Sequence, residues 1–210
     1  MSTIPPMILA FDTSSAACTA ALFDESGECV ARRDEVIGRG HAERLVPMIS
    51  ELMNDRHVAT QILVGVGPGS FTGIRVAIAA AHGLAIGWKA KLAGMDSLAL
   101  LAAGADCDGS LATAINGGHG ELFVREFNGR SLQPTSELWT ATAVEAARLT
   151  SATRVVGSGS AQLVDARGTG ESRELFPTAA NALRLPERLR SLAPKPVYAR
   201  APDARVPEAA

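Results

Sequence analysis

A glycine-rich stretch with hydroxyl side chains is the part of this sequence best suited to chemistry. It reads GVGPGSFTG at residues 65–73 and joins an apolar run to a helical pattern. At such a junction, free backbone N–H groups and the helix dipole favour an anion such as phosphate, and glycines let the backbone approach it. The same glycines are also typical of a tight turn that needs them only for its shape, with Ser70 or Thr72 capping the helix. Both interpretations remain open, because the stretch matches neither a Walker A loop nor G-x-G-x-x-G.

An acidic residue followed by hydroxyls, Asp12-Thr13-Ser14-Ser15, ends the first apolar run. This combination can hold a phosphate or a Mg²⁺-bound water. It is equally typical of an ordinary polar hairpin turn. The candidate phosphate or nucleotide site therefore combines two segments, with the residues Asp12, Thr13, Ser14, Gly67, Pro68, Gly69 and Ser70.

Searches for a nucleophile or a metal site find little. The four histidines form no HxxxH or HExxH pair, and no GxSxG elbow precedes a plausible Asp and His. The three cysteines are odd in number and show no CxxC spacing, which is typical of buried thiols in a reducing cytosol. We therefore predict no catalytic residue and no metal ligand in this chain.

Small residues recur every four positions in the helical pattern after the glycine loop, at Ala79, Gly83 and Gly87. A glycine inside a helix costs roughly 1 kcal/mol relative to alanine. Such a cost is explained if another helix packs very closely there, either from the same chain or from another subunit. Arg75 and His82 lie on the same helix, and a lone histidine there is more typical of packing than of metal binding.

The elements that must position these residues follow from hydrophobic periodicity. Apolar runs predict strands at 7–11, 18–23, 28–36, 62–66 and 91–94. Helical spacing begins after Gly40 and predicts a helix that includes Leu45 to Met53, followed by helices at about 73–88 and 97–103. Pro47 lies inside the first helix, where we expect a kink or the first turn. The order β-β-β-α-β-α-β-α is that of a ribonuclease-H-like, actin-type half.

The second half of the chain is harder to interpret. It predicts a strand pair at 111–115 and 121–127, a helix at 141–149 and a strand at 154–156. We expect an α/β protein with two lobes. Their predicted bounds are 1–104 for the first lobe, 105–197 for a smaller second lobe and 198–210 for a flexible tail.

Composition excludes several classes of function. The chain has 210 residues and a net charge of −2, so it lacks the basic footprint of a protein that binds nucleic acid tightly by itself. No uninterrupted apolar run reaches 18 residues, and the start has no basic region before its apolar run. We expect neither a membrane span nor a signal peptide.

Four segments carry a family resemblance. MILAFDTS, HAERLVPMISELM, GVGPGSFTGIRVAIAAAHGLA and GMDSLALL, in this order and spacing, resemble the TsaB (YeaZ) family. The similarity is dense from Met7 to Leu101 and weaker to Pro196-Val197-Tyr198-Ala199-Arg200. The resemblance implies the actin-like ATPase (ASKHA) fold with two ribonuclease-H-like lobes, the second one reduced.

The resemblance also implies a role in forming N6-threonylcarbamoyladenosine at position 37 of tRNA. This chain would be a non-catalytic scaffold that activates TsaD directly, with TsaE joining in a ternary complex in the cytoplasm. tRNA would be contacted only through the complex, the phosphate loop would be vestigial, and ATP and metal would be held by partner subunits. Family complexes pair the two long helices with their counterparts, which gives the candidate interface residues Leu45, Met48, Ile49, Leu52, Arg75, Ile78, Ala79, His82 and Gly83.

Two departures concern function. The HxxxH metal pair of TsaD-type enzymes corresponds here to Ser97 and Leu101, and leucine cannot bind a metal. Residues 116–119 read Asn-Gly-Gly-His, where the family often has an Asp-Ala-Arg-type segment.

Two alternative functions are weighed against the scaffold role. One is a small ASKHA ATPase or phosphotransferase that uses Asp12, and the other is a peptidase, for which this sequence lacks a nucleophile–base pair. Because its apolar helix face normally meets a related subunit, the isolated chain could also form a homodimer.

Overall fold

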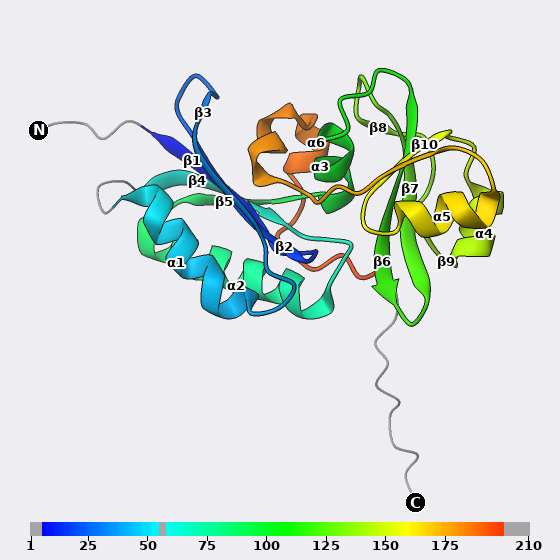
Figure 1. Cartoon of the computed structure of the whole chain (residues 1–210). Helices are drawn as coiled ribbons and strands as arrows, with labels where there is room; N and C mark the ends of the chain where they lie inside the picture. Colours follow the sequence, from blue (N-terminus) through cyan, green and yellow to red (C-terminus); the bar gives the residue numbers. More distant parts are fainter. Residues whose placement is uncertain (1–5, 55–57, 200–210) are drawn as a thin grey trace, which may run out of the picture.

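The computed structural model describes residues 6–54 and 58–199, which form two adjoining α/β lobes (Figure 1). In this part of the chain the first lobe contains a five-stranded sheet in the order β3-β2-β1-β4-β5. Its elements are β1 (Met7–Asp12), β2 (Ala17–Phe23), β3 (Cys29–Val36), α1 (His41–Met53), β4 (Ala59–Gly65), α2 (Phe71–Trp88), β5 (Lys91–Met95) and α3 (Ser97–Ala103). The first three strands are antiparallel, and β4 and β5 continue the sheet in parallel with β1. The predicted ribonuclease-H-like order is confirmed.

The second lobe carries a six-stranded sheet in the described residues, with the order β11-β10-β6-β7-β8 and β9 beside β7. Its elements are β6 (Ser110–Gly118), β7 (Glu121–Asn128), β8 (Gln133–Pro134), β9 (Trp139–Thr142), α4 (Ala143–Leu149), β10 (Arg154–Val156), α5 (Ser160–Arg167) and β11 (Glu171–Arg173). The predicted strand pair, helix and strand are all present. Helix α4 begins two residues later than predicted because Thr142 and Glu145 form a capping box at its start.

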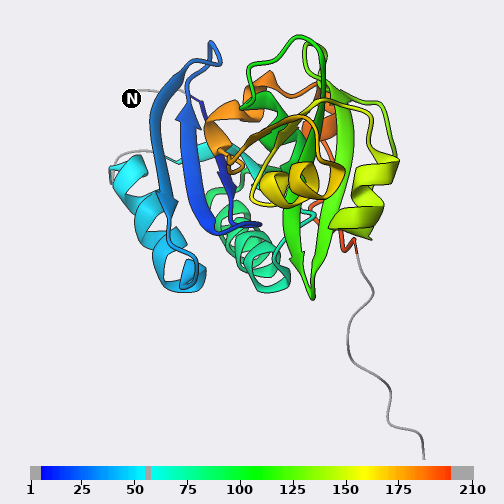
Figure 2. The same ribbon diagram turned by 45° about the vertical axis from the view of Figure 1, so that its right-hand side comes forward.

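Alternating side chains divide the molecule into layers. In β1, Leu9 and Phe11 pack in a core with α1 and α2, while Ala10 faces the opposite side. The core on that opposite face of the first sheet lies between the two lobes. It includes α3 and inward-facing residues of both sheets. A third core lies under α4 and α5. Figures 1 and 2 show α1 and α2 on the face of the first sheet that is turned away from the second lobe.

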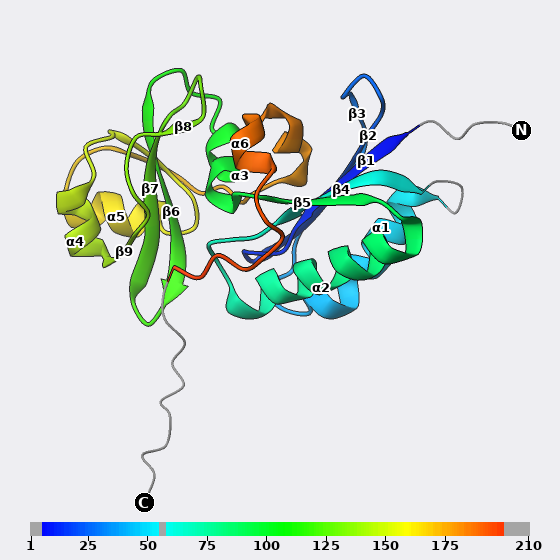
Figure 3. The same cartoon turned by 180° about the vertical axis from the view of Figure 1, so that it is seen from behind.

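The segment after β11 returns to the first lobe. A 3-10 helix, η1 (Ala179–Arg184), packs on β1 and β2, and α6 (Glu187–Arg190) packs on β5. Leu192 then pairs with Gly94 at the edge of β5. Figure 3 shows α3 and α6 side by side between the sheets. The predicted second lobe, 105–197, therefore includes residues that pack on the first sheet, because their apolar side chains complete the core between the lobes.

The last described residues are held against both lobes. The Val197 backbone N–H donates to the Val66 carbonyl over 2.8 Å, and Thr140 Oγ1 donates to the Ala199 carbonyl over 2.7 Å. The prediction of a flexible tail from residue 198 is thus wrong for Tyr198 and Ala199. The remainder of that prediction, 200–210, lies outside the described residues.

Helix α2 is long and apolar enough to cross a membrane by length and composition alone. The core helix of a globular protein meets the same criteria, and Ile74, Ala77 and Ala81 of α2 are buried on the sheet. Its opposite face is exposed. Pro47 is the seventh residue of α1, so it does not mark the first turn.

Candidate functional site

Asp12 ends β1 and is almost completely buried, at 1% exposure. Its Oδ1 accepts hydrogen bonds from the backbone N–H and the hydroxyl of Ser14, over 2.8 and 2.7 Å. Its Oδ2 accepts a hydrogen bond from Ser97 Oγ over 2.6 Å. The Ser97 hydroxyl in turn accepts from the Gly67 backbone N–H over 3.1 Å. Ser97, which corresponds in the sequence comparison above to the first histidine of an HxxxH metal pair, thus joins the two segments of the predicted phosphate site.

The glycines of the 65–73 loop make room for residues 12–14. A Cβ atom added at Gly65 would lie 1.8 Å from Asp12 Oδ2, and one at Gly69 would lie 2.1 Å from the Ser14 carbonyl oxygen. One added at Gly73 would lie 1.9 Å from the Thr13 carbonyl oxygen. Real Cβ atoms do not approach other atoms so closely. These three glycines are therefore required by packing within the chain.

Hydrogen bonds hold the same two segments together. The Ser70 backbone N–H donates to the Ser14 carbonyl over 2.7 Å, and Thr13 Oγ1 donates to the Gly73 carbonyl over 2.7 Å. Ser70 Oγ accepts from the Gly73 backbone N–H over 3.2 Å, so Ser70 caps α2 as one of the two residues predicted for that role. Pro68 is buried in the same cluster.

The predicted phosphate residues therefore meet in space, and most of their hydrogen bonds are made within this cluster and to Ser97 and Gly73. Gly67, Ser70 and Gly73 all use their backbone N–H groups within the chain, and both carboxyl oxygens of Asp12 have partners. This geometry favours the second of the two initial interpretations, in which the glycines serve the shape of the loop. Nucleotide binding at this cluster would require these internal bonds to be replaced.

Burial raises the pKa of the Asp12 carboxyl above its ordinary value, and the hydrogen bonds from Ser97 and Ser14 oppose that shift. Asp96, the cap of α3, is also buried, and burial raises its pKa against the opposing effect of Arg125. Arg125 Nη1 of β7 lies 2.7 Å from Asp96 Oδ2. This ion pair links the second sheet to the first lobe, and the sequence analysis missed it because its members lie 29 residues apart.

The altered segment 116–119 forms the end of the β6–β7 hairpin. Asn116 is fixed to the loop after β10, since its backbone N–H donates to Ser158 Oγ over 3.1 Å and its Nδ2 donates to the Ser158 carbonyl over 3.2 Å.

Among the described residues, no group of three or more His, Cys, Asp or Glu side chains could hold a metal ion. Cys18 is buried, but Cys29 is exposed, so the expectation of buried thiols is wrong for Cys29.

The predicted partner interface divides into buried and exposed residues. The α1 side chains Leu45, Met48, Ile49 and Leu52 belong to the chain's own core and are at most 7% exposed. Ile78 of α2 is also buried, at 8% exposure. The prediction that these five side chains face a partner is wrong, because their helical period matches the face that α1 and α2 turn to the sheet.

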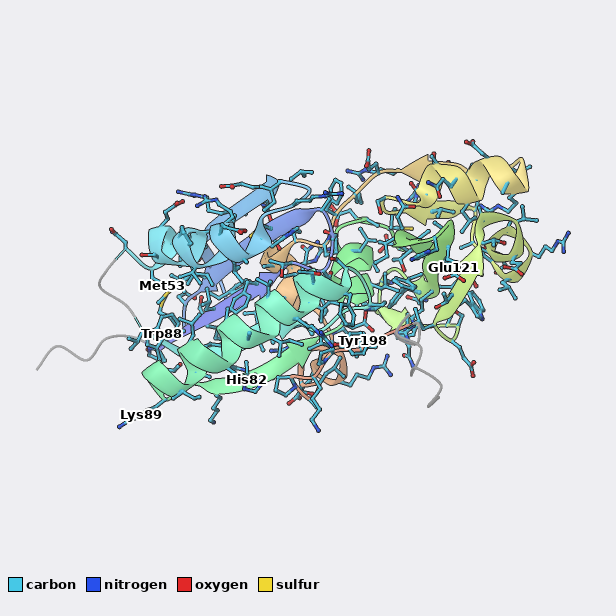
Figure 4. The ribbon with its side chains drawn as sticks, turned by 90° about the horizontal axis from the view of Figure 1, so that it is seen from below. Met53, His82, Trp88, Lys89, Glu121 and Tyr198 are labelled. Atoms are coloured by element: carbon cyan, nitrogen blue, oxygen red, sulfur yellow. The ribbon has the colours of Figure 1, made fainter. Side chains whose placement is uncertain are left out.

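The remaining predicted interface residues lie on the outer face of α2. Arg75, Ala79, His82 and Gly83 are exposed there, and a Cβ atom added at Gly83 or Gly87 would meet nothing within 4 Å. Figure 4 shows this face, with His82 along α2 and Tyr198 beside the end nearer the second lobe. No helix of the described residues packs on Gly83 or Gly87. Packing against residues 6–54 and 58–199 therefore does not explain the spacing of these two glycines.

Comparison with models of known protein families identifies the family to which this chain belongs. A family model described as TsaD, tRNA N6-adenosine threonylcarbamoyltransferase, matches residues 33–167, which is more than half of the chain. The chain belongs to the TsaD family. Within it, the chain is similar to proteins named tRNA threonylcarbamoyladenosine biosynthesis protein TsaB, so the resemblance to TsaB seen in the sequence is confirmed.

Individual relatives in the TsaD family match over part of their length. The TsaB protein of Escherichia coli strain K12 is 35% identical over 102 residues, which are 47% of this chain and 43% of that protein. The TsaB protein of Bacillus subtilis strain 168 is 32% identical over 121 residues, 55% of this chain and 52% of that protein. The chain thus spans about half, or less, of the length of these curated relatives.

Solved structures agree over nearly the whole chain. A crystal structure from Pseudomonas aeruginosa, described as an uncharacterized protein with similarity to peptidase YEAZ, has a TM-score of 0.79 at 27% identity. The match covers 93% of this chain and 100% of that one. YeaZ from the same organism has a TM-score of 0.75 at 24% identity, with 92% and 99% covered. These likenesses and the strand order confirm the predicted two-lobed, actin-like α/β fold.

Proposed function

We propose that this chain is a TsaB-type subunit of the machinery that forms N6-threonylcarbamoyladenosine in tRNA, and that it acts as a non-catalytic activator of a TsaD-type subunit. Membership of the TsaD family and similarity to TsaB proteins support the pathway. In this proposal the TsaD-type subunit binds directly, TsaE joins the pair, and tRNA is contacted only through the assembly. Since the substrate is tRNA, the proposal puts the chain in the cytoplasm.

The observation that carries the proposed partner role is the open glycine face of α2. Gly83 and Gly87 each cost roughly 1 kcal/mol of helix stability relative to alanine. Nothing in the described chain contacts the space above them. A helix of another subunit packed against this face would account for glycine at both positions, because a smooth surface lets two backbones approach closely.

The closed cluster around Asp12 supports a non-catalytic role. A phosphotransferase would need this carboxylate and the loop N–H groups to be available for a nucleotide. Here the carboxylate accepts hydrogen bonds from Ser14 and Ser97. The Gly67 and Ser70 backbone N–H groups are used as well, by Ser97 Oγ and the Ser14 carbonyl. The proposal therefore assigns ATP and metal to the partner subunits. Calorimetry with Mg-ATP and the isolated chain should detect no binding, and tight binding would instead support the ATPase alternative.

The main experiment replaces one glycine on the open face. Gly83→Leu should leave the isolated chain folded, because Gly83 is exposed and a Cβ atom added there has no described residue within 4 Å. The variant should no longer co-elute with the TsaD-type subunit of the same genome, and reconstituted tRNA modification should be lost. Ala166→Leu, at an exposed alanine of α5, is the matched control and should behave like the original chain.

Two results would contradict the proposal. One is full-rate tRNA modification by the TsaD-type subunit with this chain omitted. The other is unimpaired co-elution of Gly83→Leu. Sedimentation of the isolated chain would show whether the same face forms a homodimer in the absence of a partner, and Gly83→Leu should then dissociate it.

A further inference from the structure

Helix α2 reads FTGIRVAIAAAHGLAIGW and contains no Asp, Glu or Lys residue. Arg75 is its single arginine. It lies four residues before Ala79 and eight before Gly83, so it stands at one end of the open glycine face. The side chain is exposed and makes no ion pair with an acidic side chain of the described residues. A cation without an acidic partner therefore borders a surface that consists of small and apolar residues and His82.

Two aromatic side chains hold this arginine in place. Arg75 Nε donates a hydrogen bond to Tyr198 Oη over 2.8 Å, and the guanidinium carbon lies 3.8 Å from the ring centroid of Phe71. The rings of Phe71 and Tyr198 are themselves in contact, with centroids 5.2 Å apart. Stacking on a ring and a bond at Nε leave the four N–H groups on the two terminal nitrogens without a hydrogen-bond partner among the described residues. This cluster was not predicted from the sequence, because Tyr198 is 123 residues away from Arg75.

A guanidinium fixed in this way is suited to one chemical partner. Its planar fork matches a carboxylate, and the positive end of the helix dipole nearby also favours an anion. The long side chain of an arginine normally loses rotamer freedom on binding. Here Phe71 and Tyr198 restrict it in advance, so less freedom remains to be lost.

Covering this face with an apolar partner would remove Arg75 from water. A buried, unpaired charge is strongly unfavourable, whereas a hydrogen-bonded carboxylate compensates for the lost hydration. We propose that Arg75, held by Phe71 and Tyr198, binds a carboxylate on the partner helix that packs along Ala79 and Gly83. This inference rests on the proposed function and adds the chemistry by which the partner is recognised.

Two other occupants fit the surface less well. A second copy that packs α2 against α2 brings no carboxylate, because α2 contains no Asp or Glu. RNA would offer phosphates, but Arg75 is the one fixed positive charge of this helix, and nucleic-acid surfaces carry clusters of them. A protein partner with an apolar helix and one acidic residue matches both the open face and the single cation.

The test measures the affinity of the full chain for the TsaD-type subunit by calorimetry. Arg75→Gln should weaken binding by at least about 30-fold, the range expected when one member of a buried charge pair is removed. Arg75→Lys should lose roughly tenfold, since it keeps the charge but not the fork or the stacking. Tyr198→Phe, which removes only the hydroxyl acceptor, should lose about threefold to tenfold. Arg188→Gln, at an exposed arginine of α6, is the matched control and should bind within about twofold of the original chain.

A double-mutant cycle identifies the acid. Each Asp or Glu on the partner's contact helices is changed to the amide, and the pairing acid is the one whose loss has no further effect in Arg75→Gln. Failure of the original chain to bind would reject the proposed function. Loss of binding in Gly83→Leu with normal binding in Arg75→Gln would reject only the carboxylate pairing. So would an Arg75→Gln defect confined to self-association or to RNA binding.

Discussion

Glycines occupy two regions of this molecule for opposite reasons. In the 65–73 loop, Gly65, Gly69 and Gly73 are enclosed by residues 12–14, and added Cβ atoms would lie 1.8 to 2.1 Å from them. On α2, Gly83 and Gly87 have nothing within 4 Å of an added Cβ. The first set is explained by the folded chain itself. The second is not, which directs attention to a partner outside the chain.

The largest effect that would test this contrast is expected at Gly73. This glycine lies in the first turn of α2, where alanine would normally be favoured. Because the added methyl group would collide with the Thr13 backbone, we expect Gly73→Ala to lower the free energy of unfolding by about 3 kcal/mol. Urea denaturation of the isolated chain measures it. An unchanged or higher stability would mean that the loop can move away from residues 12–14.

A second prediction concerns the hydroxyl that joins the two segments of the cluster. Ser97→Ala leaves both Asp12 Oδ2 and the Gly67 N–H without their bonds. We expect the free energy of unfolding to fall by about 2 kcal/mol, since unsatisfied buried groups are costly. The control is Ser50→Ala, at an exposed serine of α1, which should change stability by less than about 0.5 kcal/mol. Equal effects in both variants would refute a special role for Ser97.

The same glycine-to-alanine change should have the opposite sign on the open face. Gly83→Ala adds a methyl group that has no atom of residues 6–54 or 58–199 outside its own helix within 4 Å, and alanine is the better helix former. We expect the isolated chain to gain about 1 kcal/mol of unfolding free energy. A loss of stability in this variant would show that Gly83 is enclosed after all and would remove the contrast with Gly73.

The smallest expected effect is a pH dependence that arises from Asp12. Burial raises its pKa in the folded chain above the ordinary value of 3.8, so between these two values the folded chain holds a proton that the unfolded chain has lost. The unfolding free energy from this group therefore falls as pH rises through that window and is level above it. The Asp12→Asn variant has no carboxyl group at this position, so it lacks this pH-dependent contribution to the free energy of unfolding.

Denaturation of both proteins from pH 3.5 upward gives the difference between them, in which the other titrating groups largely cancel. We expect the original chain to lose stability relative to Asp12→Asn as pH rises. A difference that increases with pH would mean that the hydrogen bonds from Ser14 and Ser97 outweigh the effect of burial.

Much of the fold could be predicted because its signals are local. Period-two and helical patterns located all the elements of the first lobe, and the strand pair β6 and β7 of the second. Six elements were not predicted: β9, η1 and α6, together with the strands β8 and β11 and the helix α5. The two strands are two and three residues long, and α5 has little apolar periodicity. Such elements are held by their neighbours more than by their own pattern.

The candidate sites were predicted less completely. The residues of the Asp12 cluster were all named, yet their mutual hydrogen bonding through Ser97 depends on how β1 and β4 lie side by side. Periodicity identified the apolar stripe of α1 but could not tell whether the chain's own sheet or a partner covers it. The family resemblance assigned Leu45 and Leu52 of this stripe to the partner interface, although they belong to the core.

By itself the sequence determined the α/β order, the family resemblance and the two sets of glycines, since each depends on residues close together in the chain. Only the tertiary structure decided which glycines are enclosed and which are open. It also brought Tyr198 to Arg75 and Asp96 to Arg125. The physical reason is that burial and long-range contacts depend on how the layers pack, and two identical residues acquire opposite roles according to what the fold places next to them.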